Sequence, residues 1–301
     1  MSAPRRLEPV VPMQFRGHAL FTGKPARLTL SATSKPGLWF SRADLPGKPR
    51  CPATVDSLSN RPIHPAFAAM STRSTTLETA NGDLIGTVEH ILSALDALGI
   101  TDALLELEGD EVPLMDAASF DFASAIELTD PSDKGPLEVR TLTGPIQVRD
   151  ERDPDVWVRA TPRSAPGRSF RYDLDYTRVT GPMAADAAAL GTQTAAWDGR
   201  PESYLTDIAP ARTFCLKAEA DAMRAAGLLA HLADNDALVI GPSGPINNAY
   251  RFANEPARHK LLDLVGDLTL IGARVQMDVY ASRSGHALNQ QLARRICAVI
   301  A

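Results

Sequence analysis

The segment NEPARHKLLDLVGDLTLIG, residues 254–272, constrains the fold of this chain more than any other part of the sequence. Its apolar residues recur at helical spacing and predict one buried face, made by Leu261, Leu264, Val265 and Leu268. Asn254 is a suitable N-cap, and Pro256 falls in the first turn, where its missing N–H costs nothing. With Gly272 just beyond the end, the pattern predicts a helix over residues 255–270.

The same helix carries His259, Asp263 and Asp267, each four residues from the next. A step of four residues corresponds to a rotation of about 40° and a rise of about 6 Å. The three side chains therefore face one way, and His259 and Asp263 can hold one ion. Polar groups beside an apolar stripe are costly to bury without a purpose, which a metal or a metal with a proton relay would supply. Taken alone, the pattern also fits an ion pair or a solvated face.

The segment TVEHILSAL places Glu89 and His90 at the start of a second predicted helix, Thr87–Leu98. The pair offers a metal ligand beside a carboxylate that can activate water. The alternative is a helix-terminal Glu favoured by the helix dipole, next to a partly buried histidine without a ligand role.

Two further segments carry candidate functional groups. RSGHALNQQL places His286 at a strand-to-helix turn, where it is either polar surface or a well-presented acid. In ARTFCL, Arg212 can hold an anion, the hydroxyl of Thr213 can polarise a carbonyl, and Phe214 can pack against a sugar or an acyl chain. None of these patterns is specific alone.

Charge and cysteine content exclude several classes of protein. A net charge of -5 argues against nucleic acid as a partner. The cysteines Cys51, Cys215 and Cys297 form neither a CxxC pair nor a disulfide framework, which predicts a cytoplasmic protein whose metal is held by His and carboxylate groups. The sequence has no apolar run long enough for a transmembrane segment and no signal-peptide pattern.

Strands and helices intermingle in both halves of the chain, which predicts an α+β fold. The Pro-, Asp- and Gly-containing segment 128–139 is the best linker candidate. Besides the helices above, we expect strands at 14–32, 103–108, 140–180, 237–240 and 275–282, and helices at 119–126, 217–227 and the C-terminal end.

Taken together, these segments resemble the bacterial lipid A deacetylase family LpxC, the UDP-3-O-acyl-N-acetylglucosamine deacetylases. The resemblance spreads over about residues 15–295. The matching segments are FTGKPARLTL (21–30), STRSTTL (71–77), GTVEHILSALDALGI (86–100), EVPLMDAAS (111–119), ARTF (211–214), NEPARHKLLDLVGDLTLIG (254–272) and RSGHALN (283–289).

The resemblance implies a zinc ion bound by three residues, His90, His259 and Asp263. It makes Glu89 the general base that takes a proton from the attacking water. His286, oriented by Asp267, becomes the acid that helps the amine leave, and Thr213 helps to stabilise the oxyanion. The implied reaction hydrolyses the N-acetyl amide of UDP-3-O-acyl-N-acetylglucosamine to a free amine and acetate, the committed step of lipid A biosynthesis.

Substrate contacts follow from the same resemblance. Lys260 lies where the family meets the anionic part of the substrate, Arg283 adds to that basic wall, and Phe214 packs against the sugar. Arg212 is a further expected substrate-binding residue. Residues 215–250 form an insert that provides the hydrophobic passage for the acyl chain. We expect a monomer that binds no nucleic acid and has no transmembrane segment. Because its substrate is acylated, we expect the protein to work close to a membrane surface.

The implied fold has two layered α/β-sandwich domains of similar topology, with helices packed between the sheets and the active site between the domains. Residues 1–130 form the N-terminal domain with Glu89 and His90. Residues 136–301 form the C-terminal domain with His259, Asp263 and His286.

The sequence departs from the family at three places. In GHALFTG (17–23), Phe21 and Ala19 replace a usual histidine and glycine, and in MDAAS Ala117 replaces a glycine. AHLADNDA (230–237) replaces a Gly-Gly-Ser stretch beside the acyl passage, so the acyl length accepted is open; within it His231 is expected to be a surface residue.

Two alternatives stay open: a non-catalytic relative that binds a UDP-sugar or lipid precursor, and a zinc amidohydrolase acting on a different N-acyl sugar. The complete catalytic set favours the enzyme over the binding protein. Ligand type and the resemblance favour zinc over iron, but two histidines and one carboxylate also suit Fe(II).

Overall fold

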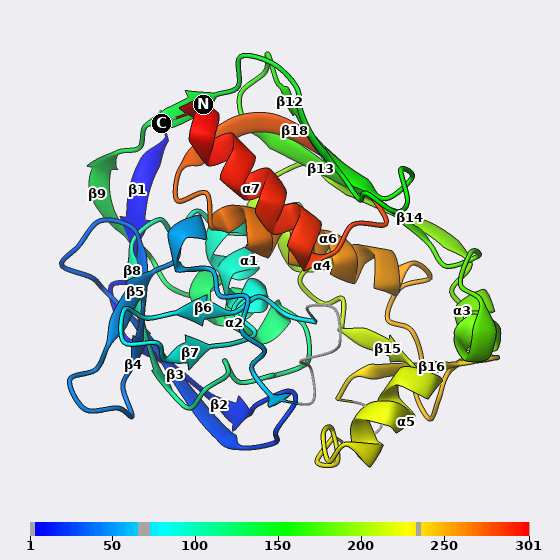
Figure 1. Ribbon diagram of the computed structural model, residues 1–301. Helices are drawn as coiled ribbons and strands as arrows, with labels where there is room; N and C mark the ends of the chain where they lie inside the picture. The colour runs from blue at the N-terminus through cyan, green and yellow to red at the C-terminus, as the bar shows by residue number, and fades with distance from the viewer. Residues whose placement is uncertain (1–3, 66–72, 233–235, 301) are drawn as a thin grey trace.

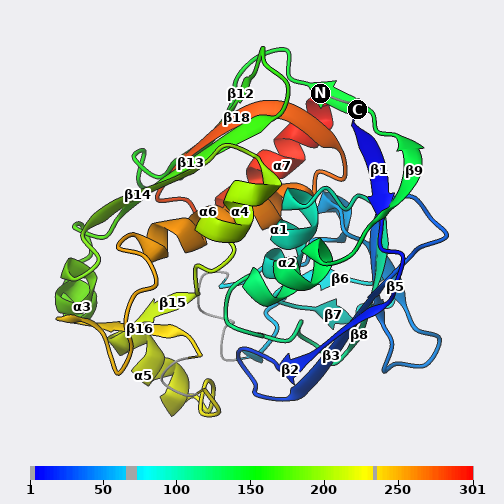
Figure 2. The same cartoon turned by 180° about the vertical axis from the view of Figure 1, so that it is seen from behind.

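Two sheets enclose a layer of helices. The computed structural model describes residues 4–65, 73–232 and 236–300. The helices between the sheets are α1 (Glu89–Ala97), α2 (Phe120–Glu127), α6 (Glu255–Thr269) and α7 (His286–Ile300) (Figure 1). The opposite view shows the same layers (Figure 2). The predicted α+β class, with helices packed between sheets, is therefore confirmed.

The first sheet comes from the N-terminal part of the chain. Its strands, in spatial order, are β2 (Met13–His18), β3 (Pro25–Ser31), β8 (Ala103–Glu108), β4 (Leu38–Arg42) and β5 (Arg50–Pro52). In β3 and β8 every second side chain is buried, as in a sheet with one face on the core. That buried face receives α1, whose residues Ile91, Leu92 and Leu95 are fully enclosed.

The second sheet comes from the C-terminal part. Its strands, in spatial order, are β11 (Ile146–Arg149), β12 (Trp157–Pro162), β18 (Arg274–Ser282), β13 (Arg168–Asp175) and β14 (Thr192–Trp197). A short strand, β10 (Val139–Thr141), also pairs with the beginning of β18. The helix α6 packs against β13 and β14 on one side and against α1 on the other. This position places α6 at the centre of the molecule.

The segment 128–139, predicted as a linker, contains a strand. Here β9 (Ser132–Pro136) pairs antiparallel with β1 (Arg5–Glu8). The ion pair between Arg5 and Asp133 joins the two strands. The segment is thus part of a two-stranded antiparallel sheet. The domain boundaries at 130 and 136 stay a prediction.

A smaller unit projects from one side of the molecule in Figure 1. It consists of β15 (Phe214–Leu216), α5 (Lys217–Ala225), β16 (Leu238–Gly241) and β17 (Gly244–Pro245). Because β15 and β16 are parallel, α5 forms the crossover between them. Its apolar side packs into a second small core with residues of the N-terminal part, among them Leu20, Phe21 and Leu114.

Short elements complete the chain. They are η1 (Val55–Ser57), β6 (Leu77–Glu78), β7 (Leu84–Ile85), η3 (Gly181–Met183), α3 (Ala184–Ala188) and α4 (Pro201–Asp207). Within the described ranges, no helix has both the length and the apolar character needed to cross a bilayer.

Candidate metal centre and active site

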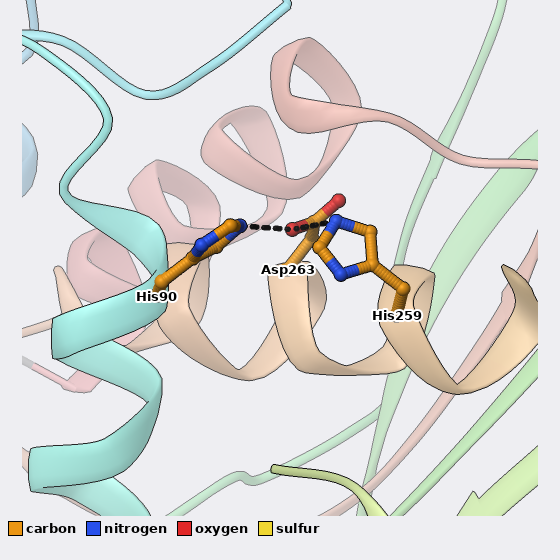
Figure 3. A group of neighbouring side chains, drawn as sticks. All are labelled: His90, His259 and Asp263. Carbon is orange, nitrogen blue, oxygen red and sulfur yellow. Dashed lines mark ion pairs between the residues drawn. The ribbon is translucent and has the colours of Figure 1, made fainter. Parts of the chain in front are cut away.

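Three side chains from two helices meet in the layer between the sheets: His90 of α1, and His259 and Asp263 of α6 (Figure 3). Their candidate ligand atoms all lie within 4.8 Å of one another. Oδ1 of Asp263 lies 3.3 Å from Nε2 of His259 and 3.7 Å from Nε2 of His90. All three side chains are buried. The structure thus brings together the residues that the sequence proposed as metal ligands.

The two imidazoles are in the neutral form that binds a metal. Burial lowers the pKa of His90 to about 3, and the neighbouring His259 adds to the effect. Burial likewise lowers the pKa of His259. The Nδ1–H of His259 donates to the carbonyl of Ala211 at 3.0 Å, which leaves Nε2 with a free lone pair toward Asp263.

Asp263 is an ionised carboxylate in a buried site. Burial alone would raise its pKa, but His259, Lys260, His286 and His90 together hold the pKa well below its usual range. Lys260 donates to Oδ2 at 2.9 Å. Among the described residues, nothing donates a hydrogen bond to the buried Oδ1. An unsatisfied carboxylate oxygen that faces two imidazole nitrogens fits a bound divalent cation.

The close approach of α1 and α6 depends on Gly266. A Cβ at this position would lie only 2.1 Å from the backbone oxygen of Glu89. Because glycine has no side chain, the first turn of α1 packs directly on α6. This contact places His90 of α1 next to His259 and Asp263 of α6.

Glu89 lies beside this cluster at the start of α1. Its Oε2 accepts a hydrogen bond from the backbone N–H of Thr75 at 3.0 Å, and the side chain is only 3% exposed. Burial raises the pKa of Glu89 to about 7, with His286 acting in the opposite direction. A carboxyl group with a pKa near 7 is suited to accept and release a proton at neutral pH.

His286, the first residue of α7, faces the same space. Its Nδ1 lies 2.9 Å from Oδ2 of Asp267, and its Nε2 lies 3.9 Å from Oε1 of Glu89. Burial disfavours the imidazolium, but the charge and hydrogen bond of Asp267 outweigh it and raise the pKa to about 9. The imidazolium form of His286 is therefore favoured at neutral pH. Asp267 contacts the Nδ1 side of this ring and fixes its orientation.

A cavity of about 150 Å³ opens onto these groups. Besides the cluster residues, its walls include Thr213, Phe214, Lys260 and Tyr176. The ring of Phe214 stands edge-on to His259, with centroids 6.3 Å apart. Nζ of Lys260 lies 6.0 Å from the centre of the Phe214 ring. Sequence-predicted groups from ARTF and from α6 thus line one space.

A second cavity, of about 220 Å³, adjoins the first. Most of its lining side chains are apolar, and many come from the projecting unit, including Ala220, Met223 and Val239. The predicted insert 215–250 contributes these walls, except that residues 233–235 lie outside the described ranges.

Arg212 is not among the residues that line the two cavities, and its predicted part in substrate binding stays a prediction. Its guanidinium is buried against the fully buried Glu255, with Nε donating to Oε1 at 2.9 Å, and its other donors bind Asn248 and the carbonyl of Ala249. The backbone N–H of Arg212 also donates to Glu255. A buried guanidinium needs such compensation, so Arg212 fixes the loop before Thr213 to the start of α6.

Arg283 is likewise not among the residues that line the two cavities. Its Nη1 donates to Asp153 at 2.7 Å, and its backbone adopts a positive φ of 55° in the turn before His286. The neighbouring Ser284 is held through its carbonyl by the hydroxyl of Tyr172. These contacts shape the turn that presents His286.

The departures from the family pattern have local structural consequences. Ala117 adopts a φ of 60°, a region that favours glycine, and its carbonyl accepts the N–H of Thr213 at 2.7 Å. Ala19 and Phe21 are buried, and the N–H of Phe21 donates to Glu111. His231 is exposed, with its ring centroid 6.5 Å from that of His18.

Sequence reasoning assigned no role to several residues that the structure places around the site. The hydroxyl of Thr75 donates to Asp267, and the amide of Asn289 donates to Oδ2 of Asp267 at 2.8 Å. Arg73 and Glu219 line the first cavity. Thr75 and Asn289 fall within two segments that matched the family, STRSTTL and RSGHALN, and that match was the available signal.

The fold and the cluster are those of an α+β protein with a buried candidate metal centre of the kind that hydrolases use. Residues 10–298 match the family described as UDP-3-O-acyl N-acetylglycosamine deacetylase, LpxC. The chain belongs to this family, one of metalloenzymes.

Individual relatives agree with the family match. A UDP-3-O-acyl-N-acetylglucosamine deacetylase of Nostoc is 34% identical over 90% of both chains. The protein of the same name from Synechocystis is 34% identical over 95% of this chain and 96% of its own. The one from Neisseria gonorrhoeae is 31% identical over 94% of this chain and 86% of its own.

Proposed function

We propose that this protein is a zinc-dependent deacetylase that hydrolyses the N-acetyl amide of UDP-3-O-acyl-N-acetylglucosamine, the committed step of lipid A biosynthesis. The observation that carries the proposal is the buried cluster of His90, His259 and Asp263 beside Glu89 and His286, in a chain of the deacetylase family. The two-domain division at 130 and 136, the monomeric state and the cytoplasmic location are part of the same proposal.

The donor set fits zinc. Two neutral imidazole nitrogens and the free carboxylate oxygen of Asp263 would hold the ion, and Lys260 neutralises part of the remaining carboxylate charge. A zinc ion bound there would polarise the amide carbonyl and lower the pKa of water. The Nδ1–H bond from His259 to Ala211 would keep that ring oriented in the free and loaded protein.

Glu89 would take the proton from the attacking water. Thr75 fixes one carboxylate oxygen through its N–H and leaves Oε1, which lies toward His286, to receive the proton. A pKa of about 7 makes Glu89 a base strong enough to accept this proton and weak enough to release it.

His286 would donate a proton from Nε2 to the departing amine. Asp267 holds the Nδ1–H of the imidazolium, so the transferable proton resides on the nitrogen that faces the cavity. The fixed charge of Asp267 also keeps the donor protonated until the amine leaves.

The remaining groups would bind the substrate. The hydroxyl of Thr213 would donate to the oxygen of the reacting amide, Phe214 would pack against the sugar, and Lys260 would attract the anionic part. The apolar cavity of about 220 Å³ would receive the acyl chain. Arg212 and Arg283 would act by positioning Thr213 and His286.

The direct test measures acetate released from UDP-3-O-acyl-N-acetylglucosamine by protein loaded with one equivalent of Zn²⁺. We expect turnover that a chelator removes and added Zn²⁺ restores. Tight substrate binding without acetate release would instead identify a non-catalytic binding protein. Faster hydrolysis of a different N-acyl sugar would identify another amidohydrolase.

A further inference from the structure

Four residues are shared by the walls of the two cavities: Leu20, Arg73, Thr213 and Phe214. The space that holds the catalytic groups and the apolar space therefore meet at this ring of side chains, which we call the threshold. Any molecule that occupies both cavities must pass through it.

Arg73 is the charged member of the threshold. Its Nη2 donates to Oε1 of Glu219 at 2.7 Å, and Glu219 in turn accepts the N–H of Leu216 at the start of α5. The Nε of Arg73 is buried and has no hydrogen-bond partner among the described residues. A buried guanidinium N–H without an acceptor is costly, so its position calls for an acceptor supplied from elsewhere.

The chemistry of the proposed substrate supplies such an acceptor. The reacting acetamido group and the acyl ester are on neighbouring carbons of the sugar ring. With the amide at the metal centre, the ester must therefore lie at the edge of the first cavity, and its chain must leave through the threshold. The ester carbonyl is then enclosed and needs a donor.

The other threshold residues do not meet this need. Leu20 and Phe214 have no side-chain donor, and the hydroxyl of Thr213 is assigned above to the reacting amide. We propose that Arg73 donates a hydrogen bond to the carbonyl of the 3-O-acyl ester, so that the threshold selects ester-linked substrates. This inference rests on the proposed function and adds a specificity residue to it.

The test compares two substrates that differ only in the carbonyl: the 3-O-acyl ester and the 3-O-alkyl ether of the same chain length. For the wild-type protein loaded with Zn²⁺, we expect kcat/KM to be about 10- to 100-fold higher for the ester, as for a hydrogen bond to a charged donor. In Arg73→Met, which keeps an unbranched apolar stem and removes the donors, this ester-to-ether ratio should fall to near one.

Glu219→Gln is the matched control. It weakens the ion pair with Arg73 but leaves the guanidinium in place, so the ester-to-ether ratio should stay close to that of the wild type. Arg73→Lys, with a single cationic group, should keep part of the ratio. Thermal unfolding of each variant separates misfolding from a change in selectivity.

Equal losses of kcat/KM for the ester and the ether in Arg73→Met would show that Arg73 only stabilises the position of α5. That result would overturn the inference. A wild-type ratio near one would overturn it as well, while leaving the deacetylase activity established. If the wild type released no acetate from either compound, the proposed function itself would fail, and this inference with it.

Discussion

Asp267 and His286 form an enclosed pair in which Oδ2 of the carboxylate lies 2.9 Å from Nδ1 of the imidazole, with both side chains no more than 4% exposed. Through this pair the pKa of His286 rises to about 9, although burial acts against it. The protonated form therefore persists through neutral pH and is lost as the pH rises through about 9.

Replacing Asp267 with Asn should move the alkaline limb of the kcat/KM profile to lower pH. Without the carboxylate charge, burial lowers the pKa of His286 and only Asp263 and Glu89 still raise it, so the acid form is lost at a lower pH than in the wild type. Activity at pH 8 should fall by more than about 10-fold, with a smaller loss at pH 6. Asn289→Ala removes a hydrogen bond to Asp267 but not its charge. If both variants shifted the limb equally, charge would not be the cause.

Glu89→Ala should separate catalysis from metal binding. We expect kcat/KM to fall by about 100- to 10,000-fold because the proton acceptor is lost. Zinc content after dialysis should stay near that of the wild type, whereas His259→Ala should lose the metal. A Glu89→Ala protein that came out of dialysis without zinc would contradict this division of roles.

Gly266→Ala should weaken the contact between α1 and α6. The added methyl group would overlap the backbone oxygen of Glu89, so the helices must separate, at a cost of about 1–3 kcal/mol in the free energy of unfolding. Zinc affinity should fall as well, because His90 moves with α1. At Gly144 an added Cβ meets no atom within 4 Å. Gly144→Ala is therefore the control, and equal stability of the two variants in urea would count against the packing argument.

Arg212→Met should reduce stability rather than substrate affinity. The change leaves Glu255 buried without its ion-pair partner, which costs about 3–5 kcal/mol in the free energy of unfolding. Arg171→Met breaks the more exposed pair with Asp173 and should cost less than about 1 kcal/mol. Urea unfolding of both variants checks the difference. A rise in KM at unchanged stability would instead show that Arg212 takes part in substrate binding.

Local pattern was sufficient to predict the helices that carry the site. The predicted helix over 255–270 corresponds to α6, Glu255–Thr269, and the predicted helix Thr87–Leu98 corresponds to α1, Glu89–Ala97. The strand Ala103–Glu108 is present with the predicted bounds. In each case the spacing of the apolar residues shows which face of the helix or strand is buried. Burial of that face also determines how the element packs in the folded protein.

Contacts between residues that are distant in the sequence could not be predicted from the local pattern of residue types. Asn254 occupies the N-cap position as predicted, but its amide binds Thr194 and Arg258, and no side-chain cap bond forms. The burial of Arg212 depends on Glu255, and the strand in the predicted linker depends on its pairing with β1. Such partners are set by tertiary packing, which a single sequence does not display.

The glycine contact between α1 and α6 makes the candidate centre depend on how these two helices pack together. One donor arrives on α1 and two on α6, and the two helices meet without room for a methyl group. A molecule whose halves dock out of register would offer an incomplete set of donors and fail to retain its ion. The zinc content of a preparation would then count the molecules that have assembled correctly.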